Sequence, residues 1–219
     1  MNNIYEKLRD RLDDFASGYP VTDSGIEIKI LKRLFTEEQA ELFLQLSPLP
    51  EAPSDVAARL ERDPAGTADM LEGMAQKGLL FRTRKKDQAL YSAISFVPGI
   101  YDFQLNTIDR EFAQDIKDYT EQGFGCTIQG HATPIMRTIP IHKKIVAQWP
   151  VAPYEDVLKI VDEQEVIAVA PCICRTKSGL LAESCGKPLE TCFMFGSKGQ
   201  YYVENHMGRF IDKAEAKEI

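Results

Sequence analysis

The sequence contains no apolar run long enough to cross a membrane, and its N-terminus shows no cationic stretch followed by an apolar one. A membrane-spanning helix needs about 18 consecutive apolar residues, and runs such as Val166–Pro171 are much shorter. Because no signal peptide is visible either, we expect a cytoplasmic protein with no membrane partner. Repeats and low-complexity tracts are also absent, and 219 residues are enough for one large or two modest folded domains.

Sequence motifs of the common enzyme classes are missing as well. The chain has no Gly-x-Gly-x-x-Gly fingerprint, no Gly-Lys-Ser/Thr phosphate loop and no Gly-x-Ser-x-Gly nucleophile elbow. Histidine is scarce, and His131, His142 and His206 lie too far apart to form a zinc pair, so we expect structural or surface histidines. No catalytic residue is assigned, and these absences disfavour a stand-alone enzyme.

The chain carries no excess of positive charge. Its 26 Lys and Arg residues are outnumbered by 33 Asp and Glu residues, which gives a net charge of −7, and both halves are negative. Binding to DNA begins with neutralisation of phosphates by Lys and Arg. The composition therefore disfavours a nucleic-acid partner.

Residues 1–95 are expected to form a winged-helix-like domain, because three short helices precede a hairpin. The expected N-cap residues of the helices are Thr36, Ser54 and Thr67. Thr36 is followed by Gln39, the spacing of a capping box. The hairpin is expected from two strand-like runs, Leu79–Thr83 and Ala89–Ile94.

A winged helix often binds DNA through its third helix, but here the chemistry is unfavourable. The outward positions of that helix are expected to be Asp69, Glu72, Gln76 and Lys77, which repel phosphates more than they attract them. The basic residues gather on the expected wing, at Arg82, Arg84, Lys85 and Lys86. We expect a docking or dimerisation module, compatible with a homodimer, rather than a sequence-specific DNA reader.

The second half has a different pattern and is expected to complete an α+β protein. A helical connector over residues 96–135 contains an expected long amphipathic helix, Asp102–Gln122, closed by Gly123. Residues 136–219 form the expected cysteine-rich domain. Its predicted elements are an edge strand over Met136–Ile141, a helix opened by Pro153, a buried strand over Glu165–Ala170, and a helix through Tyr201–Val203.

Four of the five cysteines cluster directly after that buried strand. Their spacing is Cys-x-Cys-x10-Cys-x6-Cys, and the residues are Cys172, Cys174, Cys185 and Cys192. If the strand continues, Cys172 and Cys174 face the same side. The other two thiols arrive on the expected loop Thr176–Thr191, and four thiolates make a closed metal site. Cys126 stands apart and is expected to be a structural thiol.

Thiolates suit zinc, Cu(I) and iron–sulfur clusters. Structural zinc usually uses cysteine pairs with two to four residues between them, whereas a single residue separates Cys172 from Cys174 here. The pattern therefore favours an iron–sulfur cluster, whose negative charge Arg175, Lys177 and Lys187 can offset. Zinc, and thiols that bind no metal or form disulfides, remain alternatives. His206 is the histidine nearest the cluster, 14 residues after Cys192.

Several stretches carry a family resemblance. They are Leu31–Ala40, Phe96–Tyr101, Pro171–Arg175, Cys185, Lys187–Cys192, Phe195-Gly196 and Gly208-Arg209. Together they resemble the ferredoxin-type [4Fe-4S] proteins of anaerobic bacteria that carry a winged-helix-like N-terminal region. The resemblance implies cluster binding, one-electron transfer to a protein redox partner, and Cys172, Cys174, Cys185 and Cys192 as the cluster positions.

Related proteins often continue into a ferredoxin module with Cys-x-x-Cys repeats, which this sequence lacks. Asp212 and Glu215 have the spacing of a capping box that opens a helix shortly before Ile219, so we expect a truncated chain or a lost C-terminal ferredoxin module. Two other functions stay open. One is a redox- or iron-sensing winged-helix transcriptional regulator, and the other is a zinc-stabilised interaction module.

Overall fold

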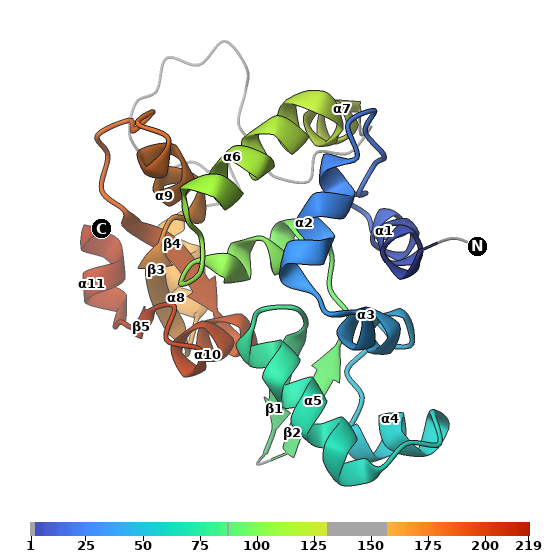
Figure 1. Cartoon of the computed structure of the whole chain (residues 1–219). Helices are drawn as coiled ribbons and strands as arrows, with labels where there is room; N and C mark the ends of the chain where they lie inside the picture. Colours follow the sequence, from blue (N-terminus) through green and yellow to red (C-terminus); the bar gives the residue numbers. More distant parts are fainter. Residues whose placement is uncertain (1–2, 87, 131–156) are drawn as a thin grey trace. The chain divides into compact units, whose positions relative to one another are not determined.

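The computed structural model describes residues 3–86, 88–130 and 157–219 (Figure 1). Helices and two small antiparallel sheets make a mixed α+β protein, as the sequence predicts. No helix among these residues is long and apolar enough to span a bilayer. The described chain divides into two compact units: unit 1 comprises residues 3–130 and 173–187, and unit 2 comprises residues 157–172 and 188–219.

Unit 1 is mostly helical. Its α-helices are α1 (Ile4–Asp13), α2 (Ile26–Leu34), α3 (Glu37–Leu44), α4 (Pro53–Arg59), α5 (Pro64–Gln76), α6 (Arg110–Tyr119), α7 (Gly125–Gly130) and α9 (Ile173–Leu180). A hairpin follows α5 and consists of β1 (Phe81–Lys85) and β2 (Gln88–Ser92). Short helical turns connect the hairpin to α6 and α6 to α7, namely η1 (Phe96–Ile100), η2 (Asp102–Gln104) and η3 (Thr120–Phe124).

The first residues of the helices in unit 1 can be compared with the expected N-cap residues. At α3 the capping box is confirmed, because the Thr36 hydroxyl accepts from the Gln39 N–H and the Gln39 side chain accepts from the Thr36 N–H. The other two expected caps are wrong. Helix α4 begins at Pro53, before Ser54, and Asp63 caps α5 by accepting from the Gly66 N–H at 2.6 Å.

A proline at the first helical position explains both errors. Pro53 and Pro64 have a fixed φ that already suits a helix, and the N–H they lack would have had no partner there. Helix α4 therefore starts one residue before Ser54, and α5 starts three residues before Thr67. Thr67 is consequently buried inside the first turns of α5 instead of capping the helix.

The predicted hairpin is present, although its strands are Phe81–Lys85 and Gln88–Ser92 instead of the expected Leu79–Thr83 and Ala89–Ile94. Strands β1 and β2 are antiparallel, with Phe81 opposite Ser92 and Lys85 opposite Gln88. A short bridge adds to its outer edge, since Glu51 and Tyr91 exchange two backbone hydrogen bonds of 2.9 Å each. The order along the chain is thus α3, the bridge residue, α4, α5, β1 and β2.

Glu72 and Arg82 connect α5 to the hairpin, which corrects two sequence expectations. The Arg82 guanidinium is 3% exposed and forms an ion pair with the Glu72 carboxylate. The Tyr91 hydroxyl donates to the same carboxylate at 2.6 Å, and Gln76 donates at 3.0 Å. Glu72 is therefore only partly exposed and is paired with the hairpin, and Arg82 does not belong to an exposed basic patch.

The long connector helix is shorter than the periodicity predicts. It begins at Arg110, because the Asp109 carboxylate caps α6 by accepting from the Phe112 N–H at 2.8 Å. Its apolar stripe over Phe112, Ile116 and Tyr119 is buried as expected. The helical segment does not end at Gly123, as expected, but continues through η3 into α7.

Aromatic side chains fill the centre of unit 1. The Tyr19 ring lies 4.6 Å from Phe96 and 4.9 Å from Tyr119, measured between centroids. The buried hydroxyl of Tyr19 donates to the Glu27 carbonyl at 3.0 Å, which satisfies its hydrogen-bonding need. Burial raises the pKa of Tyr19 well above the usual tyrosine value, so this residue stays protonated.

Unit 2 is a three-stranded antiparallel sheet with helices on both faces. Its elements are α8 (Val157–Glu163), β3 (Ile167–Pro171), β4 (Glu190–Phe195), α10 (Gly196–Glu204), β5 (Arg209–Phe210) and α11 (Lys213–Glu218). The sheet order is β4-β3-β5, and residues 167–170 of the central strand are buried, as the apolar run predicts. The helix with Tyr201 and Tyr202 is confirmed as α10, and Asp212 caps α11 as expected.

The two faces of β3 differ in size. On one face Ile167 packs with Val161 of α8 and Ala216 of α11. On the other face Ala168 and Ala170 are small, so α10 and the chain before β5 can approach closely. A Cβ at Gly199 would lie 2.8 Å from the Met194 carbonyl oxygen, and one at Gly208 only 2.5 Å from the Val169 carbonyl oxygen.

Gly208→Ala is expected to lower the free energy of unfolding by about 1–2 kcal/mol, because the added methyl group meets backbone that cannot move aside. Urea unfolding followed by circular dichroism measures the change. Gly73→Ala is the matched control: it lies inside α5 with nothing within 4 Å of an added Cβ, and should stabilise the chain slightly. An unchanged midpoint for Gly208→Ala would contradict the close contact.

The predicted strand Met136–Ile141 and the helix start at Pro153 lie outside the described residues, as do His131 and His142.

Candidate metal centre

Two of the four clustered cysteines lie on neighbouring segments of unit 2. Cys192 is in β4, directly opposite Ala170 of β3, and Cys172 is the first residue after β3. The Cys172 N–H donates to the Leu189 carbonyl at 2.7 Å, which extends the pairing past a register shift between Ala170 and Pro171. Strand pairing thus places Cys192 opposite a residue two positions before Cys172, although the two cysteines are 20 residues apart in sequence, and both are half-buried.

The expectation that Cys172 and Cys174 share an extended segment is wrong. Strand β3 ends at Pro171 and α9 begins at Ile173, so Cys172 is at a strand end and Cys174 is in the first turn of a helix. Ile173, between them, is buried. The alternation of a β-strand therefore cannot be used to orient these two sulfurs.

The expected loop Thr176–Thr191 is also shorter than predicted. Helix α9 occupies its first part, and β4 begins at Glu190. Cys174 and Cys185 belong to unit 1, and both are exposed. Glu183, two residues before Cys185, forms an ion pair with Lys117 of α6, which ties the segment after α9 to the body of unit 1. The hydrogen bond to Glu183 raises the pKa of Lys117.

A charged network at the start of β4 was not predicted. The Arg209 guanidinium donates two hydrogen bonds, of 2.9 and 2.7 Å, to the Glu190 carboxylate and also lies 2.6 Å from a Glu215 oxygen. These bonds raise the pKa of Arg209 and lower that of Glu190. Because Arg209 is on β5 and Glu190 on β4, the network crosses the sheet and fixes β4 two residues before Cys192.

The remaining sequence candidates lie apart from this pair. Cys126 is exposed on α7 in unit 1. His206 is an exposed residue with a positive φ in the turn after α10. Of the expected cations, Arg175 and Lys177 lie on α9, and Lys187 is exposed before β4.

The five cysteines all lie within the described residues, and no disulfide joins any two of them. Over residues 3–86, 88–130 and 157–219, no group of three or more His, Cys, Asp and Glu side chains is arranged to hold a metal ion. The four-cysteine site therefore stays a prediction. Comparison with known proteins gives no match to a family model, to a curated protein or to a solved structure.

Proposed function

We propose that the chain binds a [4Fe-4S] cluster through Cys172, Cys174, Cys185 and Cys192 and transfers single electrons to a protein redox partner. The observation that carries the proposal is the β3–β4 register, which places Cys192 opposite Ala170 and next to the segment that begins at Cys172. Thiolates are the ligands that iron–sulfur clusters use. When bound, the cluster supplies a centre that gains or loses one electron without bond making.

The cysteine-bearing segments suit this role in three ways. The hydrogen-bonded sheet holds the backbone of Cys172 and Cys192 in fixed positions. Ligands of an electron-transfer centre need such fixed positions, because they must not move when the electron is transferred. Cys174 lies in the first turn of α9, where unpaired N–H groups of a helix favour negative charge. Exposure of Cys174 and Cys185 is compatible with a cofactor near the surface, where a redox partner can reach it.

Anaerobic reconstitution with iron and sulfide tests the proposal. We expect about four iron and four sulfide per chain, a broad visible absorbance, and an electron paramagnetic resonance signal after reduction. Reconstitution in parallel with zinc distinguishes the alternative of a zinc-stabilised interaction module. Stoichiometric zinc without iron or sulfide would support that module and refute electron transfer.

We also propose that residues 37–92 form a winged helix that docks onto a protein partner. The order α3, Glu51 bridge, α4, α5, β1 and β2 is the support, because the bridge at Glu51 and Tyr91 extends the hairpin by a third short strand. The charges do not favour DNA. Arg82 is internal, so the exposed cations of the wing are Arg84, Lys85 and Lys86, while Asp69 faces solvent on α5.

We therefore expect no saturable binding of duplex DNA at about 50 mM salt, since a few exposed cations release too few counterions for tight binding. Fluorescence anisotropy with a labelled duplex, using cluster-loaded and cluster-free protein, measures this. A tight, salt-sensitive complex that depends on cluster loading would instead support the redox- or iron-sensing regulator.

A further inference from the structure

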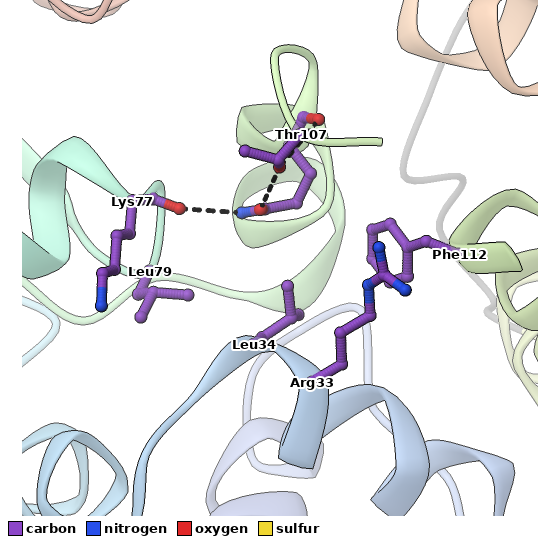
Figure 2. A pocket seen from close by; sticks show the side chains of 7 residues that line it. Arg33, Leu34, Lys77, Leu79, Thr107 and Phe112 are labelled. Atoms are coloured by element: carbon purple, nitrogen blue, oxygen red, sulfur yellow. Dashed lines mark hydrogen bonds between the residues drawn. The ribbon is translucent and has the colours of Figure 1, made fainter. Parts of the chain in front are cut away.

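A cavity of about 360 Å³ opens in unit 1 (Figure 2). The residues that line it are far in sequence from the four clustered cysteines. Seven residues from four parts of unit 1 line it: Arg33 and Leu34 at the end of α2, Lys77 and Leu79 after α5, Gln104 and Thr107 before α6, and Phe112 in α6. The volume is at the small end of the range for ligand sites in proteins, roughly 300–1,000 Å³. It suits a compact molecule rather than a nucleotide.

The polar wall of the cavity is preformed. Gln104 is buried, and its amide nitrogen donates to the carbonyl oxygens of Lys77 and Ile100 at 3.1 and 3.0 Å. Its amide oxygen accepts from the Thr107 hydroxyl at 3.0 Å (Figure 2). These bonds use the hydrogen-bonding capacity of Gln104 and hold Thr107 in place. The wall therefore needs no rearrangement to accept a ligand, and it offers few polar groups of its own.

Of the apolar side chains in the lining, Leu34 is half-buried, whereas Leu79 and Phe112 are each only 1% exposed. In Figure 2, Leu34 lies in the middle of the view, Leu79 lies to its left beside Lys77, and the Phe112 ring lies behind the Arg33 guanidinium. The guanidinium carbon is 5.1 Å from the centroid of that ring, and Arg33 also forms an ion pair of 2.6 Å with Asp109. Stacking and the ion pair fix Arg33 and neutralise much of its charge.

Lys77 is the cation in the lining that can accept a new partner. It is exposed at the end of α5, and it forms no ion pair with any carboxylate among the described residues. Figure 2 shows its side chain beside Leu79, on the opposite side of the cavity from Phe112. A ligand with a compact apolar body against Leu34 and an anionic end at Lys77 would satisfy both kinds of lining.

We propose that this cavity binds a small carboxylate with a compact apolar body, such as an aromatic acid. The apolar body replaces water over Leu34, and the carboxylate pairs with the Lys77 ammonium. This inference does not depend on the cysteines or on a cluster.

Isothermal titration calorimetry of the full chain with sodium benzoate tests the inference. We expect saturable binding of one benzoate per chain with a Kd on the order of 1 mM. Benzamide, which keeps the ring and lacks the charge, should bind about tenfold more weakly. Acetate, which keeps the carboxylate and lacks the ring, should show no measurable heat of binding.

Substitutions of Lys77 provide the second part of the test. Lys77→Ala should weaken benzoate binding about tenfold, Lys77→Arg should retain most of it, and Lys86→Ala, on the hairpin, should leave it unchanged. Circular dichroism confirms that each variant is folded. Benzoate binding that is absent, or that is equal in Lys77→Ala and the unmodified chain, would overturn the proposal. So would acetate binding as tightly as benzoate, because the apolar lining would then contribute nothing.

Discussion

Replacing Cys172 or Cys192 by serine is expected to remove nearly all visible absorbance from the anaerobically reconstituted chain. Each of the two residues supplies one of the four proposed thiolates, and they occupy neighbouring positions of the β3–β4 pairing. Serine has nearly the same size but is a poor ligand for iron, so the sheet should persist while the cluster is lost. Iron and sulfide per chain should fall by at least tenfold, and Cys174→Ser and Cys185→Ser should behave in the same way.

Cys126→Ser is the matched control, because Cys126 is an exposed cysteine on α7 that lies outside the cluster of four. It should retain full iron and sulfide content. Circular dichroism of the apoproteins separates cluster loss from misfolding, since all five variants should have the same helical signal. Full cluster content in Cys192→Ser would refute the assignment of that residue, and loss in Cys126→Ser would point to a different ligand set.

Local patterns predicted the parts of the fold whose causes are local. The Thr36 capping box was found because both of its partners lie within three residues of each other. The expected caps at Ser54 and Thr67 failed for an equally local reason, since a nearby proline determines the first helical residue. The predicted start of the connector helix at Asp102 failed because periodicity does not register a cap such as Asp109 inside an apolar stripe.

Interactions between distant segments were not accessible from one sequence. Glu72 and Arg82 were both assigned to exposed surfaces, because each is charged and nothing local indicates that α5 and β1 pair them and bury Arg82. Likewise, β4 was not predicted, because the expected loop ran to Thr191 and residues 190–195 show no alternation of apolar and polar positions. Its pairing with β3 depends on the buried apolar run at residues 167–170.

The same reasoning applies to the candidate site. The spacing of the cysteines indicates metal chemistry, but the sulfur positions depend on where β3 ends and α9 begins. A single residue, Cys172, separates the two elements, and assignment of element boundaries from sequence is uncertain by more than that. Register explains the neighbouring positions of Cys172 and Cys192, whereas strand alternation, on which the sequence argument relied, does not.

Glu72→Gln is expected to lower the free energy of unfolding by about 1–2 kcal/mol, because it removes the charge that the partly exposed Glu72 places beside the buried Arg82 cation. The carboxylate also accepts from the Tyr91 hydroxyl, and burial together with this bond raises the pKa of Tyr91 beyond the physiological range. Tyr91 therefore remains a hydrogen-bond donor at neutral pH, and the amide of glutamine accepts from it less strongly than a carboxylate does. Urea unfolding measures the loss.

Asp69→Asn provides the control on the same helix, because Asp69 is exposed and its loss should change stability by less than about 0.5 kcal/mol. A double variant, Glu72→Leu with Arg82→Met, separates charge from packing. Apolar residues of similar volume can replace a buried ion pair at little cost, so the double variant should recover most of the stability lost in Glu72→Gln. If Glu72→Gln and Asp69→Asn unfold at the same urea concentration, Glu72 does not hold the hairpin against α5. A wing free of that constraint could present Arg82 to phosphates, and the argument against DNA binding would weaken.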